Sequence, residues 1–258
     1  MIEIFKFTLL LKIMNVKDIS LQKISENAEI TNLKKILGLE QNKDYTKGID
    51  TLRYGKIMIM TDQDHDGSHI KGLLFNVFET LWGSLYKYDG FMTSLLTPII
   101  KATNNSSREI ISFYNLSDYE NWKKTIDEHK WKIKYYKGLG TSTDEEAKEY
   151  FKNMKKITYK HTEDSDEFIN LAFNKKRADD RKNWLKYYDR NSYPDFNQTK
   201  LTFGDFVDRE LIHFSNSDGL TLTCLFGRQT NCVHFQRPKT FHHQLSQPLS
   251  SILVHSRV

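Results

Sequence analysis

Cysteine is scarce in this sequence, where only Cys224 and Cys232 occur among 258 residues. Two cysteines cannot form the disulfide framework of a small secreted domain, and they suit a reducing compartment. Long hydrophobic runs are missing as well. The apolar N-terminus, MIEIFKFTLLLKIMNV, is interrupted by Glu3, Lys6 and Lys12 and has no cleavage site for a signal peptidase, so it should not span a bilayer. We expect a core strand here, in an intracellular protein without membrane contact.

Acidic residues are absent from residues 219–258, which hold both cysteines and four of the nine histidines. All 33 acidic side chains lie in residues 1–218, which are nearly neutral although the whole chain has a formal charge of +5. This excludes a global positive field, so a nucleic-acid site must be a local patch. Zinc is disfavoured in the tail, because the spacing of Cys224, Cys232, His234 and His242 matches no known ligand pattern. We expect residues 219–258 to be disordered or loosely packed.

Segments with strand and helix patterns alternate along the rest of the chain. The run KIMIM at 56–60 is continuously apolar, which is typical of a strand covered on both faces. The clearest helix follows, because apolar side chains recur in steps of three and one from Ile70 to Leu85. Residues 18–37 contain two helical pieces, the second ended by Gly38. This order predicts an α/β fold with a mostly parallel sheet flanked by helices.

The later elements are assigned in the same way. A capping box predicts a helix that begins after Ser142 or Thr143, behind a strand and a glycine loop. The remaining expectations are two strands around a turn at 104–107, a short polar helix in 118–130, one long amphipathic helix over 168–188, a linker over 191–203 and a final helix in 203–217.

The motif TDQDHDG places Asp62, Asp64 and Asp66 at every second position between the apolar run and a glycine. An EF-hand does not fit, because the twelfth position of that loop should be glutamate and is Leu73. An ordinary acidic turn is the simpler alternative, but it leaves three like charges without a cation. In extended backbone, alternate side chains point the same way, so the carboxylates can converge at the end of a parallel strand. Oxygen ligands without His or Cys favour Mg²⁺.

A second motif is KYYKGLGTST at 134–143. Gly138 and Gly140 bring backbone N–H groups close to whatever lies over the loop, and Lys137 adds positive potential. The spacing matches neither a P-loop nor a dinucleotide fingerprint, so an ordinary turn remains the alternative.

Taken together, several long motifs resemble the eukaryotic type IIA DNA topoisomerases, in their TOPRIM domain and the segment that follows it. These motifs are LRYGKIMIMTDQDHDGSHIKGLL, ITNLKKILGL, LLTPIIKAT, WKIKYYKGLGTSTDEEAKEYF, LAFNKKRADDRKNWL and DFVDRELIHFSNSD. The match runs from about Leu9 to Asp218. It implies an incomplete TOPRIM domain with a Rossmann-like sheet at 1–103, its α+β extension at 104–190, a linker towards a winged-helix domain at 191–218 and a divergent tail at 219–258.

The resemblance also implies roles for particular residues. The aspartates that match Asp62 and Asp64 hold Mg²⁺ at the DNA cleavage site, and the one that matches Asp66 supports them. The metal there neutralises charge on the scissile phosphate. For the lysines, a solvated surface charge is the alternative reading. Residues expected at or near double-stranded DNA are Lys12, Asn15, Lys71, Lys137, Arg181 and Lys182.

The sequence departs from the family in several features. We find no counterpart of the glutamate that is the family's first metal ligand, of the nucleophilic tyrosine preceded by arginine, or of the ATP-binding domain. The resemblance implies a parent enzyme that is a nuclear homodimer and uses ATP to pass one duplex through another. We expect this chain to be an inactive piece of it, with no catalytic residue. The alternatives are a non-catalytic module that binds Mg²⁺ and DNA, an inert product of a wrongly assigned gene, and a different TOPRIM enzyme such as a primase or nuclease.

Overall fold

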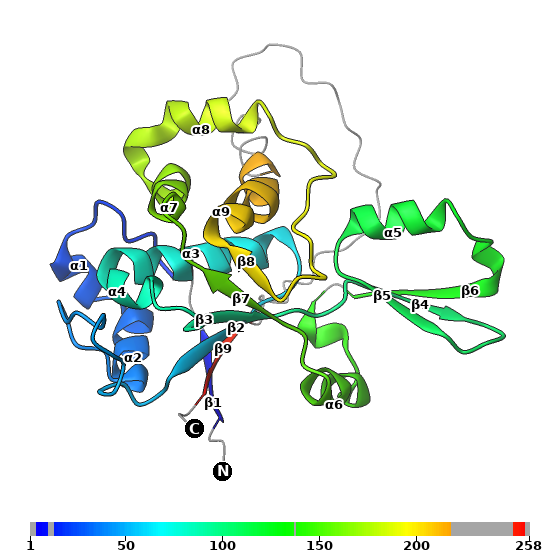
Figure 1. Ribbon diagram of the computed structural model, residues 1–258, viewed down its shortest axis with the longest axis horizontal. Helices are drawn as coiled ribbons and strands as arrows, with labels where there is room; N and C mark the ends of the chain where they lie inside the picture. The colour runs from blue at the N-terminus through cyan, green and yellow to red at the C-terminus, as the bar shows by residue number, and fades with distance from the viewer. Residues whose placement is uncertain (1–3, 10–12, 137, 218–249, 256–258) are drawn as a thin grey trace.

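The computed structural model describes residues 4–9, 13–136, 138–217 and 250–255. These residues form a six-stranded sheet in the order β1-β9-β2-β3-β7-β8 and a separate three-stranded sheet in the order β5-β4-β6 (Figure 1). The large sheet consists of β1 (Ile4–Leu9), β9 (Ser250–His255), β2 (Lys56–Met60), β3 (Met92–Leu95), β7 (Lys156–Lys160) and β8 (Lys200–Thr202). The small sheet consists of β5 (Ile110–Phe113), β4 (Ile100–Asn104) and β6 (Trp131–Tyr135).

The large sheet has mixed strand directions. The pairs β2–β3 and β7–β8 are parallel, whereas β1–β9, β9–β2 and β3–β7 are antiparallel. The predicted α/β class, with helices packed against the sheet, is confirmed. The expected boundary after residue 103 falls within β4 of the small sheet, and the later strands β7 and β8 return to the large sheet.

Helix α3 (His65–Leu81) forms the centre of the large core, as the apolar stripe predicted. Phe75 is fully buried and makes edge-to-face contacts with Tyr159, Phe203 and Phe206 at centroid distances of 4.6–5.0 Å. Each such aromatic pair stabilises the core by about 0.5–1.5 kcal/mol beyond the area that it buries. Because α3 begins directly after β2, this packing also fixes the turn between them.

The other helices surround this core or cover the small sheet (Figure 1). Gly38 ends α2 (Ala28–Leu37) in the left-handed conformation with φ 73°, and Thr143 and Glu146 form the capping box of α6 (Asp144–Lys152), as the sequence predicted. Residues 212–217 continue the last helix after a π-helical segment, η4 (Val207–Leu211). The helices are α1 (Leu21–Ser25), α2 (Ala28–Leu37), α4 (Gly83–Tyr86), α5 (Leu116–Lys123), α6 (Asp144–Lys152), α7 (Ser165–Phe173), α8 (Ala178–Leu185) and α9 (Phe203–Phe206). Within the ranges given above, none combines the length and apolarity that crossing a membrane requires.

The single long helix expected over 168–188 is wrong, because the chain breaks at Asn174 into α7 and α8. Asn174 has extended backbone, and its side chain accepts a hydrogen bond from the backbone N–H of Lys176. Such a bond offers the backbone a partner outside the helix, and this competition ends α7.

Residues 250–255 of the acid-free tail form β9, which lies between β1 and β2. Its backbone pairs antiparallel with both neighbours, so that Leu253 is opposite Lys6 on one side and Met58 on the other. These six residues are therefore part of the main sheet, although the composition suggested loose packing. The reason is that their backbone N–H and C=O groups pair with the edges of β1 and β2, which would otherwise lack hydrogen-bond partners.

Replacement of Leu253 by proline should destabilise the sheet, because proline has no N–H for a strand paired on both sides. We expect a loss of about 1–3 kcal/mol in the free energy of unfolding, because a carbonyl of the neighbouring strand loses its donor, and urea denaturation measures it. Leu253→Ala keeps the N–H and is the matched control. If both variants unfold at the same urea concentration, β9 does not hold this place in the sheet.

Candidate metal centre

The three aspartates lie on the turn from β2 to α3. Asp64 is the N-cap of α3, and its Oδ1 accepts a hydrogen bond from the N–H of Gly67 at 2.8 Å. Asp66 lies in the first helical turn, where the helix dipole favours a negative charge. Only glycine fits at position 67, because a Cβ there would lie 1.9 Å from the carbonyl oxygen of Asp62. The glycine and the cap together fix the backbone that carries the carboxylates.

The glycine loop of the second motif closes over Asp62. A Cβ at Gly138 would lie 2.7 Å from both carboxylate oxygens of Asp62, a distance that real Cβ contacts do not show. A Cβ at Gly140 would meet no described atom within 4 Å. The two motifs that the sequence singled out are therefore in direct contact, and a Cβ at position 138 would displace the Asp62 carboxylate.

The expected convergence of all three aspartates is not seen. In the ranges that the structure describes, no group of three His, Cys, Asp or Glu side chains could together hold a metal ion. The alternation of an extended strand ends at Asp64, because α3 begins at His65 and Asp66 already follows the helical period. The donor set fits Mg²⁺ in the partial manner usual for this ion, through one or two carboxylates completed by water and phosphate oxygens. Asp62 and Asp64 are the residues that would hold it.

Lys71 is buried and has an ion-pair partner. It is only 3% exposed, and its Nζ donates to Oε1 of Glu210 at 2.7 Å. Ser68 Oγ donates to the same oxygen at 2.9 Å. Burial alone would lower the pKa of Lys71, but the Glu210 carboxylate outweighs it and raises the pKa above its usual value. An ammonium group enclosed in this way does not reach a DNA backbone, so we remove Lys71 from the set of DNA contacts.

Glu210 was missed by sequence reasoning. It lies on η4, 139 positions from Lys71, and ties the last helix to the first turns of α3. A π-helical segment is rare and often marks a functional position. Lys71 itself indicated that such a residue exists, because a lysine beside the apolar face of a buried helix requires an acidic partner. The sequence does not say which carboxylate that partner is.

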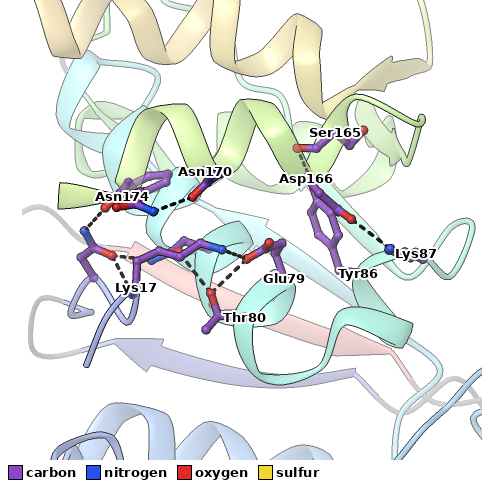
Figure 2. Close-up of polar contacts among 12 residues, drawn as sticks. Lys17, Glu79, Thr80, Tyr86, Lys87, Ser165, Asp166, Asn170 and Asn174 are labelled. Carbon is purple, nitrogen blue, oxygen red and sulfur yellow. Dashed lines mark hydrogen bonds and ion pairs between the residues drawn. The ribbon is translucent and has the colours of Figure 1, made fainter. Parts of the chain in front are cut away.

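Asn15 is held by protein contacts. Its Nδ2 donates to the carbonyl of Phe173 at 2.8 Å, and its Oδ1 accepts from Asn76 on α3 at 2.9 Å. Figure 2 shows polar contacts between α3 and α7, among them the nearby ion pair of Lys17 and Glu79. Asn15 therefore links two helices and the chain that follows β1. Lys12 and Lys137, the other expected DNA contacts of these two motifs, lie outside the described residues.

Arg181 and Lys182 are neighbours on α8 with different surroundings. Arg181 is half-buried and donates to the carbonyls of Leu171 and Asn174, which completes the end of α7. Burial lowers the pKa of Arg181. Lys182 has a side chain that is 74% exposed and contacts only Asp179, at 2.8 Å, among the described residues. Of the two, Lys182 has the side chain that is open to solvent.

Comparison with known proteins gives consistent matches. Residues 95–219 match the family described as the C-terminal associated domain of TOPRIM. The chain is 50% identical over 212 residues to DNA topoisomerase 2 of Arabidopsis thaliana, and 51% identical over 226 residues to DNA topoisomerase 2-beta of Homo sapiens. Each match covers 80% of this chain and 14% of the relative, so the chain spans about one seventh of the length of these relatives.

The fold gives the same result. A crystal structure of the Plasmodium falciparum topoisomerase II DNA-binding, cleavage and re-ligation domain superimposes with a TM-score of 0.75 and 46% sequence identity. The superposition covers 81% of this chain and 29% of that chain.

Gly138→Ala should displace Asp62, because the added methyl group overlaps its carboxylate. We expect a destabilisation of about 1–3 kcal/mol and changed amide chemical shifts over residues 61–67 in ¹H–¹⁵N spectra. Gly140→Ala, in the same loop, is the matched control and should leave those shifts unchanged. Identical spectra for the two variants would show that the loop does not contact Asp62.

Glu210→Gln should destabilise the fold strongly, because it leaves the charge of Lys71 buried without compensation. We expect a loss of about 3–5 kcal/mol by urea denaturation, and recovery of most of it in the double variant Lys71→Met/Glu210→Met. Lys182→Met, which breaks an exposed ion pair, should change the free energy of unfolding by less than about 1 kcal/mol. A single Glu210 variant as stable as the double variant would contradict the mutual compensation.

Proposed function

The chain belongs, over about four fifths of its length, to the eukaryotic DNA topoisomerase 2 family, and from this premise we propose that it binds Mg²⁺ and double-stranded DNA as the TOPRIM part of such an enzyme. The observation that carries the proposal is the contact between Asp62 and Gly138. It brings a carboxylate, a glycine loop and a helix N-terminus to one place. Carboxylates suit the cation, whereas backbone N–H groups and the helix N-terminus suit a phosphate.

The residues in and around the turn would have different roles in this site. Asp62 and Asp64 would hold Mg²⁺, which when bound supplies a Lewis acid for a phosphoryl oxygen. Asp64 also holds Gly67 in place, so the same side chain fixes the start of α3 and presents an oxygen at the surface. Lys71 and Glu210 hold the first turns of α3 against η4. Lys182, with Lys12 and Lys137, would contact the DNA backbone.

For the parent enzyme, we propose ATP-dependent passage of one duplex through another, by a homodimer in the nucleus. The isomerase class follows from the relatives, while the cofactors and the dimer remain part of the proposal. No residue of this chain is assigned as the nucleophile that would form the covalent joint with DNA. We therefore propose that this chain alone binds DNA without relaxing it.

A second candidate is a module that binds DNA without any metal. The observation in its favour is that the described residues provide no cluster of three metal-binding side chains. The two candidates differ in whether Mg²⁺ changes the affinity for DNA.

The test uses the full chain, a fluorescent DNA duplex and anisotropy measurements with Mg²⁺ or with a chelator. We expect Mg²⁺ to raise the duplex affinity at least fivefold, and Asp62→Asn/Asp64→Asn to abolish this gain together with Mg²⁺ binding in calorimetry. Glu145→Gln removes an exposed acid on α6 and should behave like the unmodified chain. DNA binding that is equal with and without Mg²⁺ would favour the metal-free module, and absence of DNA binding would refute both candidates.

A further inference from the structure

One side chain, Glu146 on α6, is hydrogen-bonded at both ends of the glycine loop. Its Oε1 accepts a hydrogen bond from the hydroxyl of Tyr136, which precedes the loop. Its Oε2 accepts from the backbone N–H of Thr143, which follows the loop, at 2.8 Å. Lys134 on β6 donates to both oxygens, at 2.9 and 2.8 Å. The same carboxylate therefore joins the end of β6 to the start of α6, and Gly138 lies in the chain between them.

The Glu146 carboxylate makes these bonds as an anion. Burial raises its pKa, but the hydrogen bonds from Lys134, Tyr136 and Thr143 outweigh burial and lower the pKa of Glu146 to about 2. Hydrogen bonds to an ionised acceptor are roughly twice as strong as those between neutral groups. The side chain is only 19% exposed, so water competes little for its oxygens. The loop is thus closed by a charged group with three donors.

Charged contacts also hold α6 against the small sheet. Within α6, all of which the structure describes, no residue is buried. Lys134 pairs with Glu146 at 2.8 Å, and Lys101 pairs with Glu149 at 3.1 Å. The two lysines are direct partners on β6 and β4, where like charges are unfavourable unless acids compensate them. Positions three apart share one face of a helix, so Glu146 and Glu149 meet both lysines together.

The closed loop reaches Asp62 through Gly138. The backbone N–H and the hydroxyl of Thr141 both donate to the carbonyl of Gly138, at 3.1 and 2.7 Å. Thr141 lies two positions before Thr143, whose N–H is bound by Glu146. Gly138 in turn lies so close to Asp62 that an added Cβ would be 2.7 Å from both carboxylate oxygens. A short series of bonds and contacts therefore runs from Glu146 to Asp62.

We propose that Glu146 is a positioning residue for the candidate metal centre, because it closes the loop that lies against Asp62. It is not a metal ligand in this proposal, and it acts on the Asp62 carboxylate only through Gly138. The inference rests on the proposed function for what the centre binds, whereas the contact of the loop with Asp62 belongs to the chain itself. Glu146 also caps α6, so the experiment separates positioning from capping.

The experiment records ¹H–¹⁵N spectra of the full chain without metal or DNA. Glu146→Gln keeps the acceptor of a capping box but removes the charge, and Tyr136→Phe removes only the hydroxyl that precedes the loop. We expect both variants to shift the amide signals of Gly138 and of residues 61–67. Glu145→Gln removes the same charge from the neighbouring exposed position and should leave those signals unchanged. A role in capping alone would move signals of α6 and not those of residues 61–67.

Calorimetry with Mg²⁺ then relates the position of Asp62 to binding. We expect Glu146→Gln and Tyr136→Phe to weaken Mg²⁺ binding at least threefold, and Glu145→Gln to leave it unchanged. Unchanged signals over residues 61–67 in either loop variant, or unchanged Mg²⁺ affinity in a chain that binds the ion, would overturn the positioning role. If the unmodified chain binds no Mg²⁺, the proposed function fails, and the shifts of residues 61–67 alone decide whether Glu146 positions Asp62.

Discussion

The site depends on a steric constraint: two backbone segments approach Asp62 so closely that neither has room for a Cβ. At Gly67 the obstacle is the carbonyl oxygen of Asp62, and at Gly138 it is the carboxylate of the same residue. Asp62 is thus held from two sides, by the turn into α3 and by a loop more than seventy positions later in the sequence. The backbone of Asp62 is therefore fixed by the turn, and its carboxylate lies against the loop before any ligand arrives, which is part of the preorganisation that a metal or phosphate site would require.

The constraint is maintained by the packing of α3. Phe75 packs against Tyr159 on β7 of the large sheet and against Phe203 and Phe206 on α9. The pair of Lys71 and Glu210 holds the first turns of the helix against η4. A buried ion pair contributes little net stability, but it admits few alternative arrangements, since each partner is unfavourable without the other. The apolar contacts therefore supply stability, while the ion pair sets the position of the helix that carries Asp64 and Gly67.

Sequence patterns predicted the parts of the fold that local chemistry determines. The stripe of α3, the left-handed Gly38 and the capping box at Thr143 all follow from residues within a few positions of one another. The break at Asn174 was also local, but helical periodicity masked a side-chain bond that competes with it. Partners distant in the sequence could not be read in this way. Neither Glu210 opposite Lys71 nor β9 between β1 and β2 has a local signal, because only the assembled fold shows which edge or charge needs a partner.

The closeness of the three aspartates is explained in part without a metal. Asp64 is stabilised by the Gly67 N–H, and Asp66 by its place in the first turn of α3, so two of the negative charges are offset by the helix that follows them. Mutual repulsion is therefore a weaker argument for Mg²⁺ than it was from the sequence. The stronger argument is the position of Asp62, because its half-buried carboxylate lies directly against the glycine loop of the second motif. What distinguishes the metal interpretation from an ordinary acidic turn is thus the contact between this carboxylate and a loop more than seventy positions later in the sequence.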